Sequence, residues 1–328
     1  MNSKTLILIF KFKNILITFL FAVSYSYTSA QSTVLTSASP GWNLLASDAK
    51  GDFDTLKLPL KRAGNLLIVE ASVDGIRGNF ILDTGAPGLI LNTTYFREKA
   101  IRKNRTSVGI AGTTTGVYEM EVNKLQISNL YYEKILVELT ELSHIENSKN
   151  IQIYGLLGTA LFEELEMYID IRRSTLTLVK PSKNVTPKRN ADVNTLLSVS
   201  NNALIIPLKV NGKILNTCFD TGAEMLVLDP LLPNKILNNV QLTKRLNVTG
   251  TGGQKTEVWS GTLKSLQFGK LEIKNTEVLI TNLQQLSEVY GQPIDAIIGF
   301  ALLDKGIIYI NMRKNQFAMY LYKEDENE

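Results

Sequence analysis

Short runs of alternating apolar and polar residues, each ended by turn residues, recur along the whole chain. Residues 68–75 (IVEASVDG) predict a strand that enters an Asp-Gly turn. Residues 205–212 (IIPLKVNG) predict a strand that enters an Asn-Gly turn, the strongest short hairpin signal. Further strand pairs are expected at 167–171 with 175–179 and at 307–312 with 316–321, and short helical patches at 160–165, 283–290 and 301–304. The pattern predicts an all-β fold with few short helices.

The chain contains two copies of one unit. The tetrapeptide Asp-Thr-Gly-Ala begins at Asp83 and again at Asp220, 137 positions later, and each copy lies between two apolar runs. Other landmarks repeat in the same order with offsets of 137 to 141 positions: Gly75 and Gly212, Gly112 and Gly250, Gly158 and Gly299. A duplicated fold explains two long copies, whereas a solenoid would need several shorter repeats.

Composition indicates where the two copies join. Residues 181–200 are rich in Pro, Lys, Asn and Ser, which is typical of a linker. We therefore expect an N-terminal lobe at residues 31–180, a linker at 181–200 and a C-terminal lobe at 201–328.

The overall composition excludes several classes of protein. Of the 328 residues, 44% are hydrophobic and 20% charged, as in chains with real cores, and the net charge of +4 is spread out. Without a basic stripe interleaved with aromatic residues, nucleic acid is not an expected partner. Cys218 is the single cysteine and His144 the single histidine, so we expect no internal disulfide, no metal and no cofactor.

Cysteine, histidine and tryptophan are rare in this chain, and the expected positions of three such residues are as follows. Cys218 occupies a core position of the second copy and is expected to be a small buried hydrophobe. His144 lies in a polar stretch and is expected at the solvated surface. Trp259 is expected either in the core or in a substrate pocket.

The first thirty residues resemble an export signal. Lys4, Lys11 and Lys13 precede a nine-residue apolar run at 15–23, and small residues ending at Ala30 precede Gln31. The run is shorter than the ~20 residues of a membrane span. We expect a signal peptide at residues 1–30, a periplasmic or secreted protein, and no stable membrane association after cleavage. The alternative is an uncleaved N-terminal anchor.

The repeated tetrapeptide has the composition that a pair of cooperating acids requires. A pseudo-two-fold axis can bring Asp83 and Asp220 face to face, where two like charges cannot both ionise and the pair shares one proton. Gly85 and Gly222 allow a sharp turn directly after each acid, because they have no Cβ. The hydroxyls of the threonines between acid and glycine, Thr84 and Thr221, can form hydrogen bonds across the axis.

Two glycine-rich segments between predicted strands are candidates for a flap. Residues 109–116 and 250–253 are predicted to be mobile hairpins that close over a binding site. The candidate flap and substrate-binding residues are Gly112, Thr113, Thr114, Gly250, Thr251 and Gly252.

Together these motifs resemble the two-lobed aspartic peptidases, similar in layout to pepsin and in detail to the retropepsin-like bacterial aspartyl proteases. The resemblance covers residues 56–320. It implies two homologous acid-protease β-barrel lobes with an active-site cleft between them. It also implies that Asp83 and Asp220 are the catalytic dyad, supported by Thr84, Gly85, Thr221 and Gly222. Because both halves lie on one chain, we expect a monomer.

The resemblance implies a secreted aspartic endopeptidase that acts on peptides or unfolded proteins. Water activated between the two aspartates would hydrolyse the peptide bond. The alternative is a non-catalytic protein that uses the same cleft to bind peptides.

The export signal leads to a first prediction. Because the apolar run is followed by small residues, the mature protein should begin near Gln31. N-terminal sequencing of exported material checks this expectation. A protein that still begins at Met1 would instead support the anchored alternative.

Overall fold

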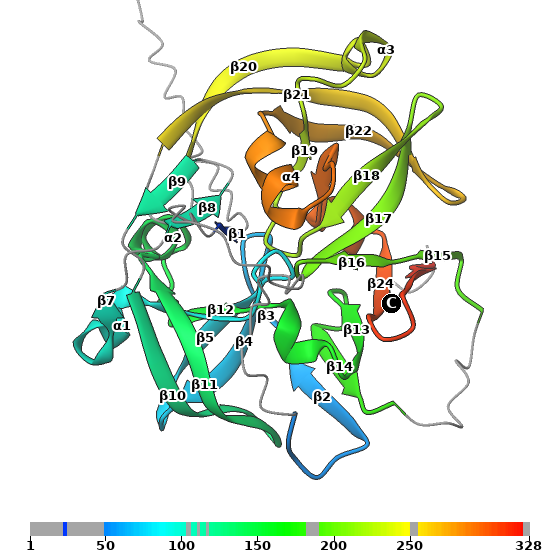
Figure 1. Ribbon diagram of the computed structural model, residues 1–328. Helices are drawn as coiled ribbons and strands as arrows, with labels where there is room; N and C mark the ends of the chain where they lie inside the picture. The colour runs from blue at the N-terminus through cyan, green and yellow to red at the C-terminus, as the bar shows by residue number, and fades with distance from the viewer. Residues whose placement is uncertain are drawn as a thin grey trace, which may run out of the picture.

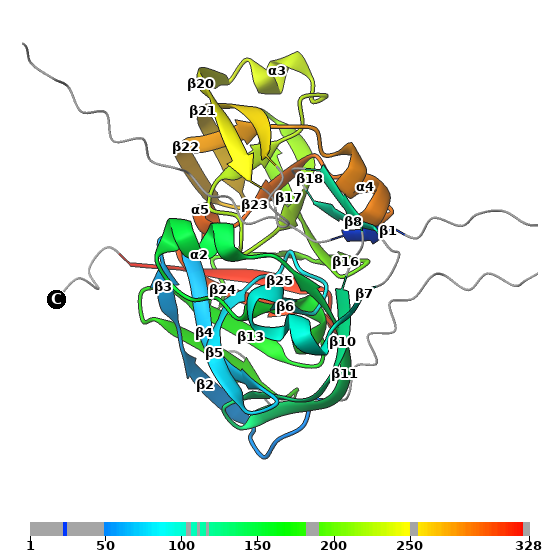
Figure 2. The same ribbon diagram turned by 90° about the vertical axis from the view of Figure 1, so that its left-hand side faces the viewer.

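The computed structural model describes residues 22–24, 49–102, 106–109, 112–115, 118–181, 190–249 and 255–323. It is mostly β and forms two barrel-like lobes joined by a shared sheet (Figure 1). Figure 2, turned by 90°, shows the N-terminal lobe below and the C-terminal lobe above. The all-β prediction is confirmed.

Each lobe is built on an eight-stranded sheet. The N-terminal sheet has, in spatial order, β3 (Lys61–Ala63), β4 (Leu66–Val73), β5 (Ile76–Leu82), β12 (Gly155–Leu157), β6 (Leu89–Asn92), β11 (Leu130–Thr140), β10 (Tyr118–Ile127) and β7 (Ile101–Arg102). The C-terminal sheet has β16 (Ser198–Ser200), β17 (Ala203–Val210), β18 (Lys213–Phe219), β23 (Ala296–Ile298), β19 (Leu226–Leu228), β22 (Leu271–Ile280), β21 (Lys255–Phe268) and β20 (Val240–Thr249). Position by position, the two orders correspond. Extra pairings of β4 with β10 and of β17 with β21 curl each sheet into a barrel.

A six-stranded sheet joins the lobes. Its spatial order is β15 (Val193–Leu196), β25 (Gln316–Leu321), β24 (Gly306–Asn311), β13 (Glu166–Asp170), β14 (Thr175–Val179) and β2 (Thr55–Pro59). At its centre Tyr168 of β13 pairs with Tyr309 of β24, and the ring centroids are 4.8 Å apart. Because these tyrosines are 141 positions apart, equivalent residues meet here, and the pseudo-two-fold axis passes between them.

The turns of the first hairpins have the backbone that their residues favour. Asp74 and Gly75 have φ of 48° and 86°, and Asn211 and Gly212 have φ of 44° and 80°. Positive φ at both central residues produces the tight hairpin turn that matches the twist of paired strands. The hairpins β4–β5 and β17–β18 are therefore confirmed.

Most of the buried apolar positions belong to one large core that spans both lobes and the shared sheet. It includes Phe80 from the N-terminal sheet, Ile308 from the shared sheet and Phe219 from the C-terminal sheet. Phe317 of β25 packs edge-on against Phe219, with ring centroids 4.9 Å apart. The shared sheet thus covers both lobes from one side, because its buried positions alternate with exposed ones.

Helices are short and lie between strands. They are α1 (Thr93–Phe96), α2 (Ser143–Lys149), α3 (Asn234–Leu237), α4 (Gln284–Tyr290), α5 (Phe300–Leu303) and the 3₁₀ turns η1 (Arg97–Lys99) and η2 (Thr159–Phe162). The patches expected at 160–165, 283–290 and 301–304 correspond to η2, α4 and α5. Across the described residues, none of these helices is long and apolar enough to span a membrane.

Two strands lie within residues 181–200, where the linker is expected, and the division of the chain into lobes stays a prediction. Residues 190–200 are not only a connection, because they contain β15, which pairs with β25, and β16, which pairs with β17. Residues 182–189 lie outside the described ranges. β2, which comes from the expected N-terminal lobe, forms an edge of the shared sheet.

A fourth, three-stranded sheet consists of β1 (Ala22–Ser24), β8 (Thr106–Gly109) and β9 (Gly112–Thr115). β1 belongs to the expected signal peptide and pairs with β8. The rest of residues 1–30 lies outside the described ranges, so the signal peptide stays a prediction.

The repeated glycines at the ends of β12 and β23 lie where no side chain fits. A Cβ on Gly158 would lie 2.4 Å from the Ala86 carbonyl oxygen, and one on Gly299 would lie 1.9 Å from that of Asp220. These contacts are with backbone atoms of the Asp-Thr-Gly-Ala turns, which cannot rotate away. Each glycine therefore lets its strand pass directly beside an acid turn.

Replacing these glycines should loosen both lobes. We expect Gly158→Ala and Gly299→Ala each to lower the free energy of unfolding by about 2 kcal/mol or more, because the new methyl group overpacks the turn. Urea unfolding checks this, with Gly75→Asn as the control, since nothing lies within 4 Å of a Cβ there and Asn tolerates positive φ. A Gly299→Ala protein as stable as the wild type would contradict the packing argument.

Candidate active site

Each candidate aspartate directly follows a strand that lies between two neighbours in its sheet. Asp83 follows β5, and its amide donates to the Leu157 carbonyl at 3.0 Å; Asp220 follows β18, and its amide donates to the Ile298 carbonyl at 2.9 Å. β5 and β12 run parallel, as do β18 and β23. The parallel neighbours β12 and β23 therefore fix the point along each sheet at which the chain turns away after the aspartate.

The threonines link the two acid turns across the pseudo-two-fold axis. The Thr84 amide donates to Oγ1 of Thr221, and the Thr221 amide donates to Oγ1 of Thr84, both at 3.0 Å. Each hydroxyl then donates across the axis, Thr84 to the Phe219 carbonyl at 3.0 Å and Thr221 to the Leu82 carbonyl at 2.7 Å. These four buried hydrogen bonds hold the strands that lead to the two aspartates in a fixed relation.

The two carboxylates lie side by side in a buried site. Asp83 is 1% exposed and Asp220 0% exposed. The Gly85 amide donates to Asp83 Oδ1 at 2.9 Å, and the Gly222 amide donates to Asp220 Oδ1 at 2.8 Å. A Cβ on Gly85 would lie 2.8 Å from either carboxylate oxygen of Asp220, so a side chain here would collide with the opposite acid. The structure brings together all six residues that were expected to form the dyad and its support.

Burial changes the proton affinity of this pair. Desolvation raises the pKa of Asp83, and it raises the pKa of Asp220 well above its usual range, with the negative charge of Asp83 adding to the effect at Asp220. The glycine amides act in the opposite direction, because they stabilise the ionised form. Two adjacent carboxylates with raised pKa values favour a state in which the pair holds one proton.

Apolar clusters adjoin the dyad in both lobes. Ala86 lies in a cluster with Ile90, Leu142 and Ile145, and Ala223 lies in the corresponding cluster of the other lobe. The members of that second cluster include Cys218, Val227, Leu283 and Leu286. Cys218 is fully buried, which confirms its expected core role.

The first candidate flap is a hairpin. Gly112, Thr113 and Thr114 belong to β9, which pairs with β8. β8 lies beside α4 of the C-terminal lobe, so the hairpin reaches from one lobe to the other (Figure 1). Gly250, Thr251 and Gly252 lie outside the described residues, between the long paired strands β20 and β21. The flap role of both segments stays a prediction.

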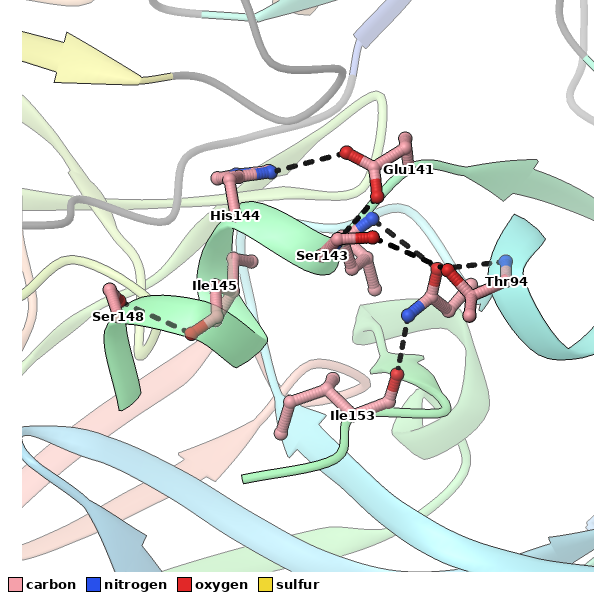
Figure 3. Close-up of polar contacts among 9 residues, drawn as sticks. Thr94, Glu141, Ser143, His144, Ile145, Ser148 and Ile153 are labelled. Carbon is pink, nitrogen blue, oxygen red and sulfur yellow. Dashed lines mark hydrogen bonds and ion pairs between the residues drawn. The ribbon is translucent and has the colours of Figure 1, made fainter. Parts of the chain in front are cut away.

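The expectation for His144 was wrong, and so was the core alternative for Trp259. His144 is not a solvated surface residue: its side chain in α2 is 15% exposed, Glu141 lies 3.8 Å away (Figure 3), and burial lowers its pKa. Trp259 is not a core residue, because it is 42% exposed on β21 with the guanidinium of Arg245 4.4 Å above its ring.

Several supporting residues escaped the sequence analysis. The Thr159 hydroxyl lies 3.0 Å from the carbonyl oxygens of both Thr84 and Ala86, beneath the first acid turn. Asn92 accepts from the Leu142 amide, and Asp229 accepts from the Leu283 amide, in equivalent places of the two lobes. These two residues are 137 positions apart, so extending the repeat alignment further would have found them.

Among the described residues, no group of three or more His, Cys, Asp or Glu side chains could hold a metal ion.

Comparison with known proteins agrees with the duplicated architecture. A family model described as aspartyl protease matches residues 69–161 and 206–302, one match in each lobe, and the chain belongs to this family. Among curated proteins, no sequence matches the chain. Solved structures similar to it include a retropepsin-like aspartic protease from Rickettsia conorii, at 17% identity over 40% of this chain and 94% of that chain, with a TM-score of 0.28. Basic 7S globulin from soybean is 8% identical over 81% of this chain and 95% of that chain, with a TM-score of 0.45.

The raised pKa values of the dyad lead to a prediction about pH. A serine at position 86 or 223 could donate a hydrogen bond to the ionised carboxylate, which would lower the pKa of the pair. Ala86→Ser combined with Ala223→Ser should therefore move the acidic limb of the pH–rate profile down by roughly 0.5–1 unit, the shift that corresponds to one hydrogen bond. The profile reports values that belong to the pair.

The matched control for this experiment is Ala71→Ser, which also buries a hydroxyl but lies in the main core of the molecule. Its pH–rate profile should match that of the wild type. An unchanged acidic limb in the double variant would mean that other contacts determine the proton affinity of the dyad.

Proposed function

We propose that this protein is an exported aspartic endopeptidase in which Asp83 and Asp220 activate water. The observation that carries the proposal is the pair of buried carboxylates held side by side by reciprocal threonine hydrogen bonds. Membership of the aspartyl protease family supports the same chemistry. Export rests on the signal-like residues 1–30.

The proposed mechanism uses one shared proton. The ionised carboxylate accepts a proton from a water molecule between the two acids, and that water attacks the peptide carbonyl carbon. The protonated carboxyl donates a hydrogen bond to the carbonyl oxygen as it gains charge. A proton then passes to the leaving nitrogen, the carbon–nitrogen bond breaks, and the dyad returns to its single-proton state. No covalent bond forms between the protein and the substrate.

The surroundings of the dyad support this division of roles. Burial disfavours the doubly ionised pair, and the Gly85 and Gly222 amides stabilise the one charge that remains. The rigid link between Thr84 and Thr221 means that little reorganisation is needed when the proton moves. The apolar clusters around Ala86 and Ala223 adjoin the site on either side.

The substrate is proposed to be an extended peptide. The β8–β9 hairpin, which lies beside α4, could pair with such a peptide through its backbone, as in strand addition. A monomer suffices for this site, because both aspartates come from one chain.

Removing either carboxylate tests the proposal. Asp83→Asn and Asp220→Asn should each reduce cleavage of a denatured protein mixture by at least about 10²–10⁴-fold, because one acid cannot perform both proton transfers. Thermal unfolding at neutral pH should occur at the same or a higher temperature, since a buried charge has been replaced by a neutral group. The measurements are peptide release and the melting temperature.

The matched control is Asp304→Asn, which changes an exposed carboxylate paired with Lys305. Its activity should equal that of the wild type. If either folded dyad variant kept full turnover, the dyad assignment would be wrong. If the wild type bound denatured protein without cleaving it, the peptide-binding alternative would be favoured.

A further inference from the structure

A buried ion pair crosses from one lobe to the other directly beside the second acid turn. Glu224 follows the tetrapeptide that begins at Asp220, and Lys149 is the last residue of α2 in the N-terminal lobe. Lys149 Nζ lies 2.5 Å from Glu224 Oε1, and the two side chains are only 13% and 10% exposed. Figure 2 shows α2 at the edge of the N-terminal lobe that faces the C-terminal lobe.

The pair is enclosed by the turn between β3 and β4. The backbone of Asn65 forms a hydrogen bond with the Glu224 carboxylate. Gly64, with φ of 66°, packs so closely that a Cβ there would lie 3.0 Å from Lys149 Nζ. Arg62 of β3, just before this turn, donates to the side chain of Asn65 at 3.2 Å. Glu224 is thus held by two separate elements of the opposite lobe.

Hydrogen bonds on both sides of helix α2 hold it in place, and with it Lys149. Asn92, at the end of β6, accepts from the Leu142 amide at 3.4 Å and donates to the Ile153 carbonyl at 2.8 Å. The Ser143 amide donates to Glu141 Oε1 at 2.6 Å, and Figure 3 shows this contact at the start of the helix. The N-terminal lobe therefore fixes the helix on both sides before Lys149 reaches across the boundary.

The duplication does not repeat this pair. The residue equivalent to Lys149 in the C-terminal lobe is Tyr290, 141 positions later, and it too is the last residue of its helix. The residue equivalent to Glu224 in the first tetrapeptide region is Pro87, 137 positions earlier. Tyrosine and proline cannot form an ion pair, so the two halves of the symmetric site differ here.

Stability does not explain why this pair is present. Desolvation raises the pKa of Glu224 even though Lys149 lies beside it, so burying the charge is not fully compensated. Buried ion pairs can often be replaced by apolar residues without loss of stability. What an ion pair contributes, and an apolar contact does not, is a fixed direction and distance between two groups.

We propose that Lys149 and Glu224 are positioning residues of the dyad, whose ion pair fixes the Asp220 turn against the N-terminal lobe so that the two carboxylates meet in one geometry. This inference rests on the proposed peptidase function. Because Glu224 follows the Asp220 turn and Pro87 stands at the equivalent position after the Asp83 turn, the ion pair adds to the threonine hydrogen bonds at the Asp220 turn alone.

The decisive variant replaces both charges by apolar residues, Lys149→Met with Glu224→Leu. We expect its melting temperature to equal or exceed that of the wild type. We expect kcat to fall about ten- to a hundred-fold while KM changes little, because a small misplacement of the reacting groups costs about this much. The conservative variant Lys149→Arg, which keeps the charge and reach, should retain most of kcat.

Single replacements add a readout that a purely structural role would not produce. Glu224→Gln leaves a cation near the dyad and should move the acidic limb of the pH–rate profile to lower pH. Lys149→Met removes that cation and should move the acidic limb to higher pH. As a control, Lys50→Met with Glu133→Leu removes an ion pair whose side chains are 44% and 46% exposed, and it should change neither kcat nor the profile.

The outcomes separate this inference from the proposed function. If the wild type cleaves peptides and the double variant does so with an unchanged kcat, the positioning role is wrong and the peptidase function stands. If the wild type does not cleave, the proposed function fails, and amide hydrogen exchange at Thr84 and Thr221 decides the role of the ion pair. Faster exchange in the double variant at unchanged global stability supports the positioning role, and unchanged exchange overturns it.

Discussion

The hydrogen bonds between Thr84 and Thr221 are the constraint on which the rest of the site depends. Each threonine gives both its hydroxyl and its amide to the opposite lobe, so neither acid turn has a complete set of partners without the other. Buried polar groups left without partners are costly. The two lobes must therefore meet in one register, and the shared sheet, centred on Tyr168 and Tyr309, maintains that register from the far side of the core.

This register forces two acids together in a place that disfavours charge. Burial raises the pKa of both Asp83 and Asp220. The packing around them is so close that no side-chain atom fits at Gly158 or Gly299. The fold thus holds a charged site that costs stability, since the ionised pair is more stable in water than in the protein. Such a cost is expected where a site is built for chemistry.

Much of this arrangement could be predicted from the sequence because it depends on local patterns repeated at a constant offset. The strands β4 and β17, their turns and the placement of both acids follow from alternation and from the repeat. The edge strands β15 and β16 were missed because they are short and largely exposed, and backbone pairing alone defines them. His144 was misplaced because its burial depends on tertiary packing around α2, which its polar neighbours conceal. No local window could show that Lys149 meets Glu224, which lies 75 positions away in the other lobe.

A duplication on one chain also permits differences that a site made from two identical subunits would not. Equivalent positions have kept the same task where the symmetric core requires it, as with Asn92 and Asp229, which both hold the residue before a helix. They have diverged where the symmetry is not required, as with Lys149 and Tyr290 or Pro87 and Glu224. A symmetric dyad has two equivalent carboxylates, but a single water attack needs one base and one acid. Differences between the residues beside the two acid turns are a physical means by which one chain can make two chemically identical carboxylates unequal.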